Sequence, residues 1–320
     1  MSQKPLKVYF LGSARIAVTA LDKLFHDPNI EIVGIGTQLD KPKGRKKRLT
    51  PTPVGEWALQ NDYPIDKIQN INNDDFYPKL EDLDIDFMVV IAFGQLLKPH
   101  VLDIPKIACI NVHASILPDY RGASPIATCL LNGDKETGVA IMKMEKGLDS
   151  GPVFQTHKLE IPKAINAYDL ETELATVTSE NIVNDLISIA TNKLNATEQD
   201  HDKATFCHKI SKEDGVIDFR QTASEIIQKI QAFTPWPGAQ ISEETAKGRK
   251  VLQIVSAQEI AFDNCVDAGT IVSTEKRRVI VACAAGTCLE ILRVIPQGKK
   301  EMPAADCRNG GLLRAGTSLL

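Results

Sequence analysis

Two apolar runs in the first half of the chain constrain the fold most. DFMVVIAFG (86–94) and IACINV (107–112) are almost continuously apolar, which is typical of strands inside a parallel sheet that helices cover on both faces. Two further strand-like runs, LKVYFLG (6–12) and IEIVGIG (30–36), flank RIAVTALDKLFHD (15–27), whose apolar residues recur at helical spacing. The first half is therefore predicted to be an α/β domain with a Rossmann-like, doubly wound, mostly parallel sheet.

The pattern changes after residue 136. TGVAIMKME (137–145) and PVFQTHKLEI (152–161) follow each other without a helix, so we expect the sheet to turn antiparallel at this edge. A long helix is predicted from about 168 to 193, followed by a polar stretch with few apolar anchors. We place the domain boundary there, which gives domains 1–207 and 208–320. Short strands separated by glycines in the second domain predict a small C-terminal β-barrel of the OB-like type.

Composition excludes several classes of protein. The 320 residues suffice for two domains, and 43% hydrophobic and 24% charged residues are ordinary for a globular chain. No apolar stretch approaches the roughly 18 residues of a membrane-spanning helix, and the first ten residues do not resemble a signal peptide. The seven cysteines are scattered without a CxxC pair, which favours reduced thiols. We therefore expect a cytoplasmic protein without a membrane partner.

The charge is unevenly distributed. The net charge of −4 gives no overall attraction to nucleic acid, yet six of the eight residues in KPKGRKKR, from Lys41 to Arg48, are basic. Smaller basic clusters follow at 247–250, 276–278 and 299–300. Local basic clusters on an acidic chain indicate a defined footprint for a polyanion. The alternative is an ordinary solvated loop.

The candidate chemistry lies at the end of the run IACINV. Asn111 and His113 are two positions apart, so in a strand both side chains point to the same face. The Asn amide is a hydrogen-bond donor, and the imidazole can accept or donate a proton near neutral pH. Together they can stabilise an oxyanion and move a proton, which acyl transfer requires. The alternative is a chance N-x-H pattern with a structural histidine.

Asp149 is a second candidate, because it lies between Gly147 and Gly151 in the loop after an expected buried strand. Its carboxylate can orient His113 or relay a proton, although Asp and Gly are also the commonest residues of plain turns. The spacing in sequence does not determine whether Asp149 and His113 meet. No P-loop, G-x-S-x-G or H-E-x-x-H motif is present, and Cys207 with His208 has no partner cluster. We therefore expect no metal site.

The motifs resemble those of one family. NVHASILPDYRGASPI (111–126) resembles the signature of the formyltetrahydrofolate-dependent formyltransferases, and KGLDSGPV (146–153) resembles the loop that carries their catalytic Asp. The likeness extends from about residue 6 to at least 300. Further matching segments are TQLDKPKGRKKRLTPTPV (37–54), VVIAFGQLLKP (89–99), HKISKEDGVIDF (208–219) and AFTPWPGA (232–239). One departure is GSARIA (12–17), where the family usually has Gly-Thr-Pro-x-Phe-Ala.

The resemblance implies a transferase of translation initiation. It would move a formyl group from 10-formyltetrahydrofolate, its co-substrate, to the free amine of initiator methionyl-tRNA, and we expect a monomer. The resemblance assigns catalysis to Asn111, His113 and Asp149. The residues implied in folate binding are Phe93, Gly94, Gln95, Ser115, Ile116, Leu117, Pro118, Met144 and Gly147. Those implied in tRNA binding are Lys43, Arg45, Lys46, Lys47 and Arg48.

Two alternatives remain open. The first is a formyltransferase that acts on an amino-sugar nucleotide, which would share the catalytic trio. The basic run argues against it, because six positive charges suit a long polyanion better than one small nucleotide. The second is a tRNA-binding protein without catalysis, against which the presence of Asn111, His113 and Asp149 argues. A glycinamide ribonucleotide formyltransferase would lack the second domain.

Overall fold

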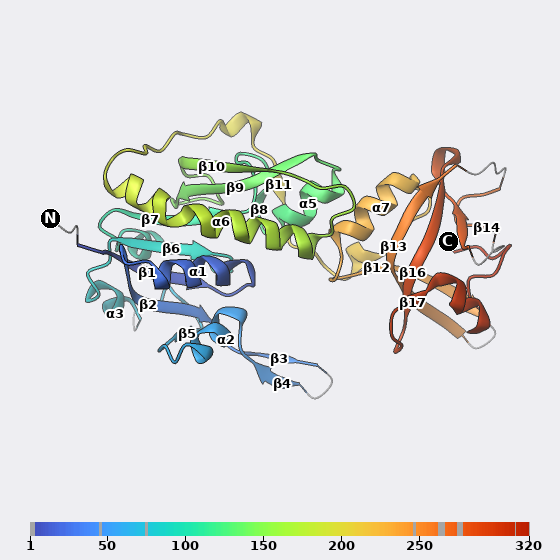
Figure 1. Ribbon diagram of the computed structural model, residues 1–320, viewed down its shortest axis with the longest axis horizontal. Coiled ribbons are helices and arrows are strands. Elements are labelled where there is room, and N and C mark those ends of the chain that lie inside the picture. The colour runs from blue at the N-terminus through green and yellow to red at the C-terminus, as the bar shows by residue number, and fades with distance from the viewer. Residues whose placement is uncertain are drawn as a thin grey trace. The chain divides into compact units, whose positions relative to one another are not determined.

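The computed structural model (Figure 1) describes residues 4–44, 47–73, 76–245, 248–261, 266–273, 278–310 and 312–319. The chain folds into two compact units, which we call the first unit and the C-terminal unit. The first unit consists of residues 1–125, 136–160 and 171–207. The C-terminal unit consists of residues 126–135, 161–170 and 208–320. The division into domains 1–207 and 208–320 stays a prediction.

A seven-stranded mixed sheet forms the centre of the first unit. Its strand order is β10-β9-β7-β6-β1-β2-β5, and the strands from β7 to β5 run parallel. β9 pairs antiparallel with both β7 and β10, as expected for this edge. The strands are β1 (Leu6–Gly12), β2 (Ile30–Gln38), β5 (Asp66–Ile68), β6 (Phe87–Ile91), β7 (Ala108–His113), β9 (Glu136–Lys143) and β10 (Val153–Glu160).

Helices pack against this sheet. Those of the first unit are α1 (Ile16–His26), α2 (Pro53–Gln60), α3 (Tyr77–Glu81), α4 (Pro99–Leu102) and most of α6 (Ala167–Ala190). The helix α5 (Pro125–Leu131) falls almost entirely within the C-terminal unit. Figure 1 shows α1 and α6 side by side, and Thr19 Oγ1 on α1 donates to the Ala175 carbonyl of α6 at 3.2 Å. An apolar cluster joins alternate residues of the central strands, such as Met88 and Cys109, to Leu80 of α3 and Val101 of α4.

Two short strand pairs extend from this unit. β3 (Lys41–Lys43) and β4 (Arg48–Thr50) form an antiparallel hairpin, and β8 (Arg121–Gly122) pairs in parallel with β11 (Phe206–Cys207). The sequence patterns predicted neither pair. The second pair joins the loop after β7 to a segment more than eighty residues further along the chain.

The C-terminal unit contains the helix α7 (Ala223–Ala232) and a curled antiparallel half-barrel. Its described strands run in the order β12-β13-β16-β15-β14, with β17 beside β16. Ile226 and Ile230 of α7 pack into an apolar core with Leu252 and Ile254 of β13. The strands are β12 (Ala239–Thr245), β13 (Gly248–Ile260), β14 (Ile271–Ser273), β15 (Ile280–Ala282), β16 (Cys288–Pro296) and β17 (Met302–Pro303).

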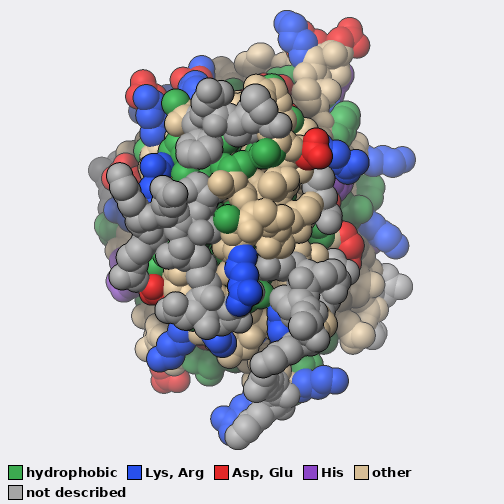
Figure 2. Space-filling model, turned by 90° about the vertical axis from the view of Figure 1, so that its right-hand side faces the viewer, with side chains coloured by type: hydrophobic (Ala, Val, Ile, Leu, Met, Phe, Trp, Pro, Cys, Tyr) green, Lys and Arg blue, Asp and Glu red, His purple; other side chains and the backbone are tan. Residues whose placement is uncertain are grey.

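The predicted fold class, a mostly parallel α/β sheet followed by a small β domain, is confirmed. On the face of the molecule drawn in Figure 2, Lys and Arg side chains are dispersed, with some Asp and Glu among them. Among the helices that the structure describes, none has the length and apolarity needed to cross a membrane.

Candidate active site

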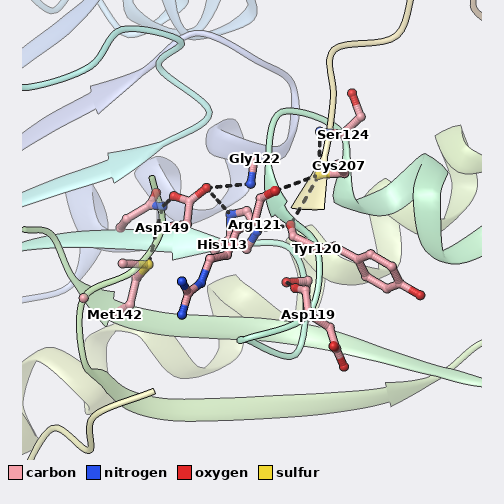
Figure 3. A network of polar contacts seen from close by, with 12 residues as sticks. His113, Asp119, Tyr120, Arg121, Gly122, Ser124, Met142, Asp149 and Cys207 are labelled. Carbon is pink, nitrogen blue, oxygen red and sulfur yellow. Dashed lines mark hydrogen bonds and ion pairs between the residues drawn. The ribbon is translucent and has the colours of Figure 1, made fainter. Parts of the chain in front are cut away.

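The structure brings Asn111, His113 and Asp149 together, and Figure 3 labels His113 and Asp149. Asn111 and His113 lie at the carboxyl end of β7 and share a face, as their spacing predicted. Asn111 Nδ2 donates to Asp149 Oδ1 at 3.2 Å, and His113 Nδ1 lies 3.8 Å from Asp149 Oδ2. The His113 and Asp149 side chains are 7% and 15% exposed. An amide, an imidazole and a carboxylate thus meet in a largely water-excluded place.

Asp149 reaches this place because its loop folds back over the sheet. After β9 the chain reverses, and Met144 N donates to the Cys109 carbonyl of β7 at 2.8 Å. Asp149 itself has φ +46°, which is uncommon for a residue other than glycine. At Gly151 an added Cβ would lie 2.1 Å from the Lys143 carbonyl oxygen. Gly151 is therefore required by a close approach of two backbones.

A backbone amide also binds the Asp149 carboxylate. Gly122 N, on β8, donates to Asp149 Oδ2 at 2.8 Å. Gly122 has φ +121°, and an added Cβ would lie 2.2 Å from the carbonyl oxygen of Cys207 on β11. Only glycine permits this backbone to lie between Asp149 and β11.

Gly122→Ala is expected to shift β8 away from β11 and to lower both stability and turnover. The methyl group meets a carbonyl oxygen, and the left-handed φ disfavours any side chain, so a loss of roughly 1–3 kcal/mol in the free energy of unfolding is expected. Chemical denaturation measures this loss. Gly44→Ala is the control, because Gly44 also has positive φ but an added Cβ there meets nothing within 4 Å. Equal losses for the two variants would contradict the steric argument.

The hydrogen bonds fix the tautomer of His113. Its Nε2 lies 2.9 Å from the carbonyl oxygen of Tyr120, which only accepts, so Nε2 carries a proton. In the neutral ring the lone pair is therefore on Nδ1, which faces Asp149. A proton that arrives at Nδ1 produces an imidazolium beside the Asp149 carboxylate. The site is thus built to take up a proton at a defined atom.

Several residues of this site were not predicted from the sequence. Tyr120 contributes only its carbonyl, and Gly122 only its amide, so neither leaves a side-chain signal. Cys207 Sγ lies 3.3 Å from the Tyr120 carbonyl oxygen, and Gln199 Nε2 donates to the Asp149 carbonyl at 2.9 Å. Gln199 and Cys207 belong to the polar stretch that has the composition of a linker.

The predicted folate residues lie around the ends of β6, β7 and β9. Phe93 is buried, and its carbonyl accepts from Gln38 Nε2 at 2.6 Å. Ser115 is buried and its hydroxyl donates to the Asp119 carbonyl at 2.5 Å, within the loop after β7. Gly94 and Gly147 are exposed. Leu117 packs against Met142 of β9. Gln95 Oε1 accepts a hydrogen bond from Ile71 N at 2.9 Å. Their role in folate binding stays a prediction, as does that of Ile116, Pro118 and Met144.

The basic run forms the β3–β4 hairpin. Its flanks pair as short antiparallel strands rather than forming an ordinary loop, and Lys43, Lys47 and Arg48 are exposed. Arg45 and Lys46 lie outside the described residues. In Figure 1 the hairpin projects from the end of β2. Exposed cations on a projecting ribbon are accessible to a large polyanion.

The described residues contain no group of three or more His, Cys, Asp or Glu side chains that could hold a metal ion.

Cys109, on the same face of β7 as Asn111, has a thiol whose pKa is raised by burial. It lies 3.6 Å from the sulfur of Met144 and packs as an apolar residue.

Comparisons with known proteins show the family of the chain. A sequence profile described as formyl transferase matches residues 6–186, and one described as the formyl transferase C-terminal domain matches residues 209–311. Methionyl-tRNA formyltransferase of Hahella chejuensis is 39% identical over 96% of this chain and 95% of its own. Those of Kosmotoga olearia and Bacillus subtilis are 35% and 34% identical, over 98% of this chain and 99% and 97% of theirs.

Solved structures share the fold at lower identity. WlaRD, a sugar 3N-formyl transferase crystallised with dTDP and 5-N-formyl-THF, has a TM-score of 0.64 at 18% identity and covers 93% of this chain and 100% of its own. The N-formyltransferase from Helicobacter canadensis, in complex with folinic acid and dTDP-3-aminofucose, has a TM-score of 0.63 at 17% identity, over 89% and 98%. The fold is thus common to several formyl transferases. The relatives from Hahella, Kosmotoga and Bacillus, each more than 30% identical to this chain, are all named methionyl-tRNA formyltransferase. This chain belongs to the methionyl-tRNA formyltransferase family.

Proposed function

We propose that this chain transfers a formyl group from 10-formyltetrahydrofolate to the amine of methionine on initiator tRNA. The observation that carries the proposal is the convergence of Asn111, His113 and Asp149, which supplies an oxyanion donor and a proton acceptor at one point. The relatives named methionyl-tRNA formyltransferase extend over nearly the whole chain, including the C-terminal unit, and support the choice of acceptor.

Each side chain has a defined task in this proposal. The folate supplies an activated formyl group when bound. The attacking amine releases a proton, and Nδ1 of His113 accepts it because Nε2 is already protonated. Asn111 Nδ2 has two hydrogens, of which one is donated to Asp149 Oδ1 and the other is directed at the Met142 sulfur, 4.0 Å away. Because a thioether is a weak acceptor, the second hydrogen can donate to the formyl oxygen instead as negative charge develops there. Asp149 stabilises the imidazolium until His113 returns the proton to the leaving nitrogen.

The substrates are assigned to separate surfaces. The predicted folate residues, 93–95, 115–118, Met144 and Gly147, lie in the loops that follow β6, β7 and β9 of the first unit. The basic hairpin and the basic residues of the C-terminal unit are assigned to the phosphates of tRNA. Phosphate binding by these basic residues distinguishes the proposal from the alternative of an amino-sugar nucleotide acceptor, which offers far fewer phosphates.

Formyl transfer to two acceptors tests the function directly. The protein is incubated with 10-formyltetrahydrofolate that carries a labelled formyl group, and with either methionyl-tRNA or an amino-sugar nucleotide. Labelled formylmethionyl-tRNA is the expected product. Label in the sugar instead would establish the alternative acceptor. Binding of tRNA without transfer to either acceptor would establish a tRNA-binding protein without catalysis.

Neutralising the basic hairpin is expected to weaken tRNA binding in a salt-dependent way. In the triple variant Arg45→Ala, Lys46→Ala, Lys47→Ala, the KM for methionyl-tRNA should rise. The slope of log KM against log salt should fall by about one unit for each phosphate that the variant no longer neutralises, since each neutralised phosphate releases condensed counterions. The KM for the folate should not change, because its pocket is assigned to other loops.

A matched control removes the same number of positive charges elsewhere in the first unit. Lys23, Lys158 and Lys203 are suitable, since each is paired with a nearby carboxylate. Their triple alanine variant has the same net charge as the hairpin variant and should keep the wild-type salt slope. Equal slopes for the wild type and the hairpin variant would exclude the hairpin from the tRNA interface.

A further inference from the structure

The amide of Gln199 is fully used inside the first unit. The residue is 8% exposed. Its Nε2 donates to two backbone carbonyls of one loop, at 2.9 Å to Asp149 and 2.7 Å to Gly151. Its Oε1 accepts from Arg121, at 3.1 Å from Nε and 2.7 Å from Nη2. A side chain this well satisfied holds its partners in one arrangement.

The partners are the elements that place the catalytic carboxylate. Asp149 adopts a left-handed φ of +46°, a conformation that persists only where the surroundings impose it. Gln199 binds the carbonyls of Asp149 and of Gly151, two positions later, and so fixes the turn that directs the carboxylate. Through Arg121 it also contacts β8, whose Gly122 amide binds that carboxylate.

We propose that Gln199 is a positioning residue for the formyl transfer, acting through Asp149. The inference rests on the proposed function. Gln199 contacts backbone carbonyls and Arg121 rather than the reacting side chains, so it influences the reaction by holding the Asp149 carboxylate at His113 and Asn111. A displacement of about 1 Å at a reacting centre can lower a rate roughly 100-fold.

Arg121 makes one substitution especially informative. Its guanidinium is buried and contacts two neutral groups, the Gln199 amide and His201 Nδ1, the latter at 3.0 Å. In Gln199→Glu one carboxylate oxygen replaces Oε1 and gives Arg121 a charged partner, which strengthens that hydrogen bond. The other oxygen replaces Nε2 and faces two carbonyls that it cannot bind. The substitution should therefore keep the fold while releasing the Asp149 loop.

The test compares stability with turnover in the full-length protein. For Gln199→Glu we expect a melting temperature at or above that of Gln199→Ala, and for both variants a kcat lowered roughly 10- to 100-fold with little change in the KM for methionyl-tRNA. The control is Gln60→Glu, on the exposed end of α2, which should match the wild type. Wild-type kcat in Gln199→Glu, or a loss of kcat that follows the melting temperature across the variants, would overturn the proposal.

A double-mutant cycle separates positioning from a general structural role. In the Asp149→Ala background, Gln199→Ala should no longer lower the single-turnover rate, because the group it positions is absent. Additive losses would show that Gln199 acts independently of Asp149. Failure of the proposed function is a different result from failure of the positioning role. If the proposed function is wrong, the wild-type protein will not formylate methionyl-tRNA, whereas if only the positioning role is wrong, it will. If the wild type formylates an amino-sugar nucleotide instead, the same cycle with that acceptor gives the same two outcomes.

Discussion

His113→Ala and Asp149→Ala are each expected to lower kcat by about two to four orders of magnitude, the range for a general acid–base group. His113→Ala removes the atom that we propose takes the proton from the amine. Asp149→Ala removes the carboxylate proposed to stabilise the resulting imidazolium, and it also removes the acceptor that lies 3.2 Å from Asn111 Nδ2. Both roles belong to the transition state, so the KM for methionyl-tRNA should stay near the wild-type value. Steady-state kinetics at saturating folate measures both constants.

A second His–Asp pair in the first unit provides the matched control. His157 Nε2 on β10 lies 2.7 Å from Asp185 Oδ2 on α6, and both side chains are mostly buried. Burial raises the pKa of Asp185, and its hydrogen bond with His157 offsets part of this effect. His157→Ala and Asp185→Ala should lower stability but leave the kcat of the folded protein unchanged. Equal kcat losses for the two pairs would mean that the effect at His113 arises from folding.

The strands and the direction of the candidate catalytic side chains were predictable because they depend on local patterns. The apolar run before Asn111 predicted β7, and the period of two predicted that Asn111 and His113 share a face. Helical spacing likewise predicted α1, and two successive strand-like runs predicted the antiparallel edge formed by β9 and β10. These inferences require no knowledge of contacts between distant residues.

The contacts that hold Asn111, His113 and Asp149 in place were not predictable from local sequence patterns. The β8–β11 pair joins strands of two residues each, too short for any periodicity, across more than eighty residues of sequence. Gln199 lies in a polar stretch that has the composition of a linker, and its role depends on two backbone carbonyls. Tyr120 and Gly122 act through backbone atoms. Sequence patterns therefore predicted the groups proposed to react, and the tertiary contacts revealed the groups that hold them.

Asn111→Asp is expected to lower kcat by at least about two to three orders of magnitude, the usual cost of one oxyanion donor. The substitution keeps the size of the side chain but replaces the donating nitrogen with an acceptor. A negative charge then faces the oxygen on which negative charge develops. The structure adds a second effect, because Asn111 Nδ2 already lies 3.2 Å from Asp149 Oδ1. Two carboxylates at this distance repel each other and compete for one proton.

Asn111→Ala separates the two effects. It removes the donor without adding a charge, so its kcat should lie between those of Asn111→Asp and the wild type. If the repulsion displaces the Asp149 loop, Asn111→Asp should also have the lower melting temperature of the two. The kcat values and melting temperatures of both variants give the measurement, with the KM for methionyl-tRNA as the check on substrate binding. Wild-type turnover in Asn111→Asp would mean that the reaction needs neither a donor from residue 111 to the formyl oxygen nor the hydrogen bond between Asn111 and Asp149.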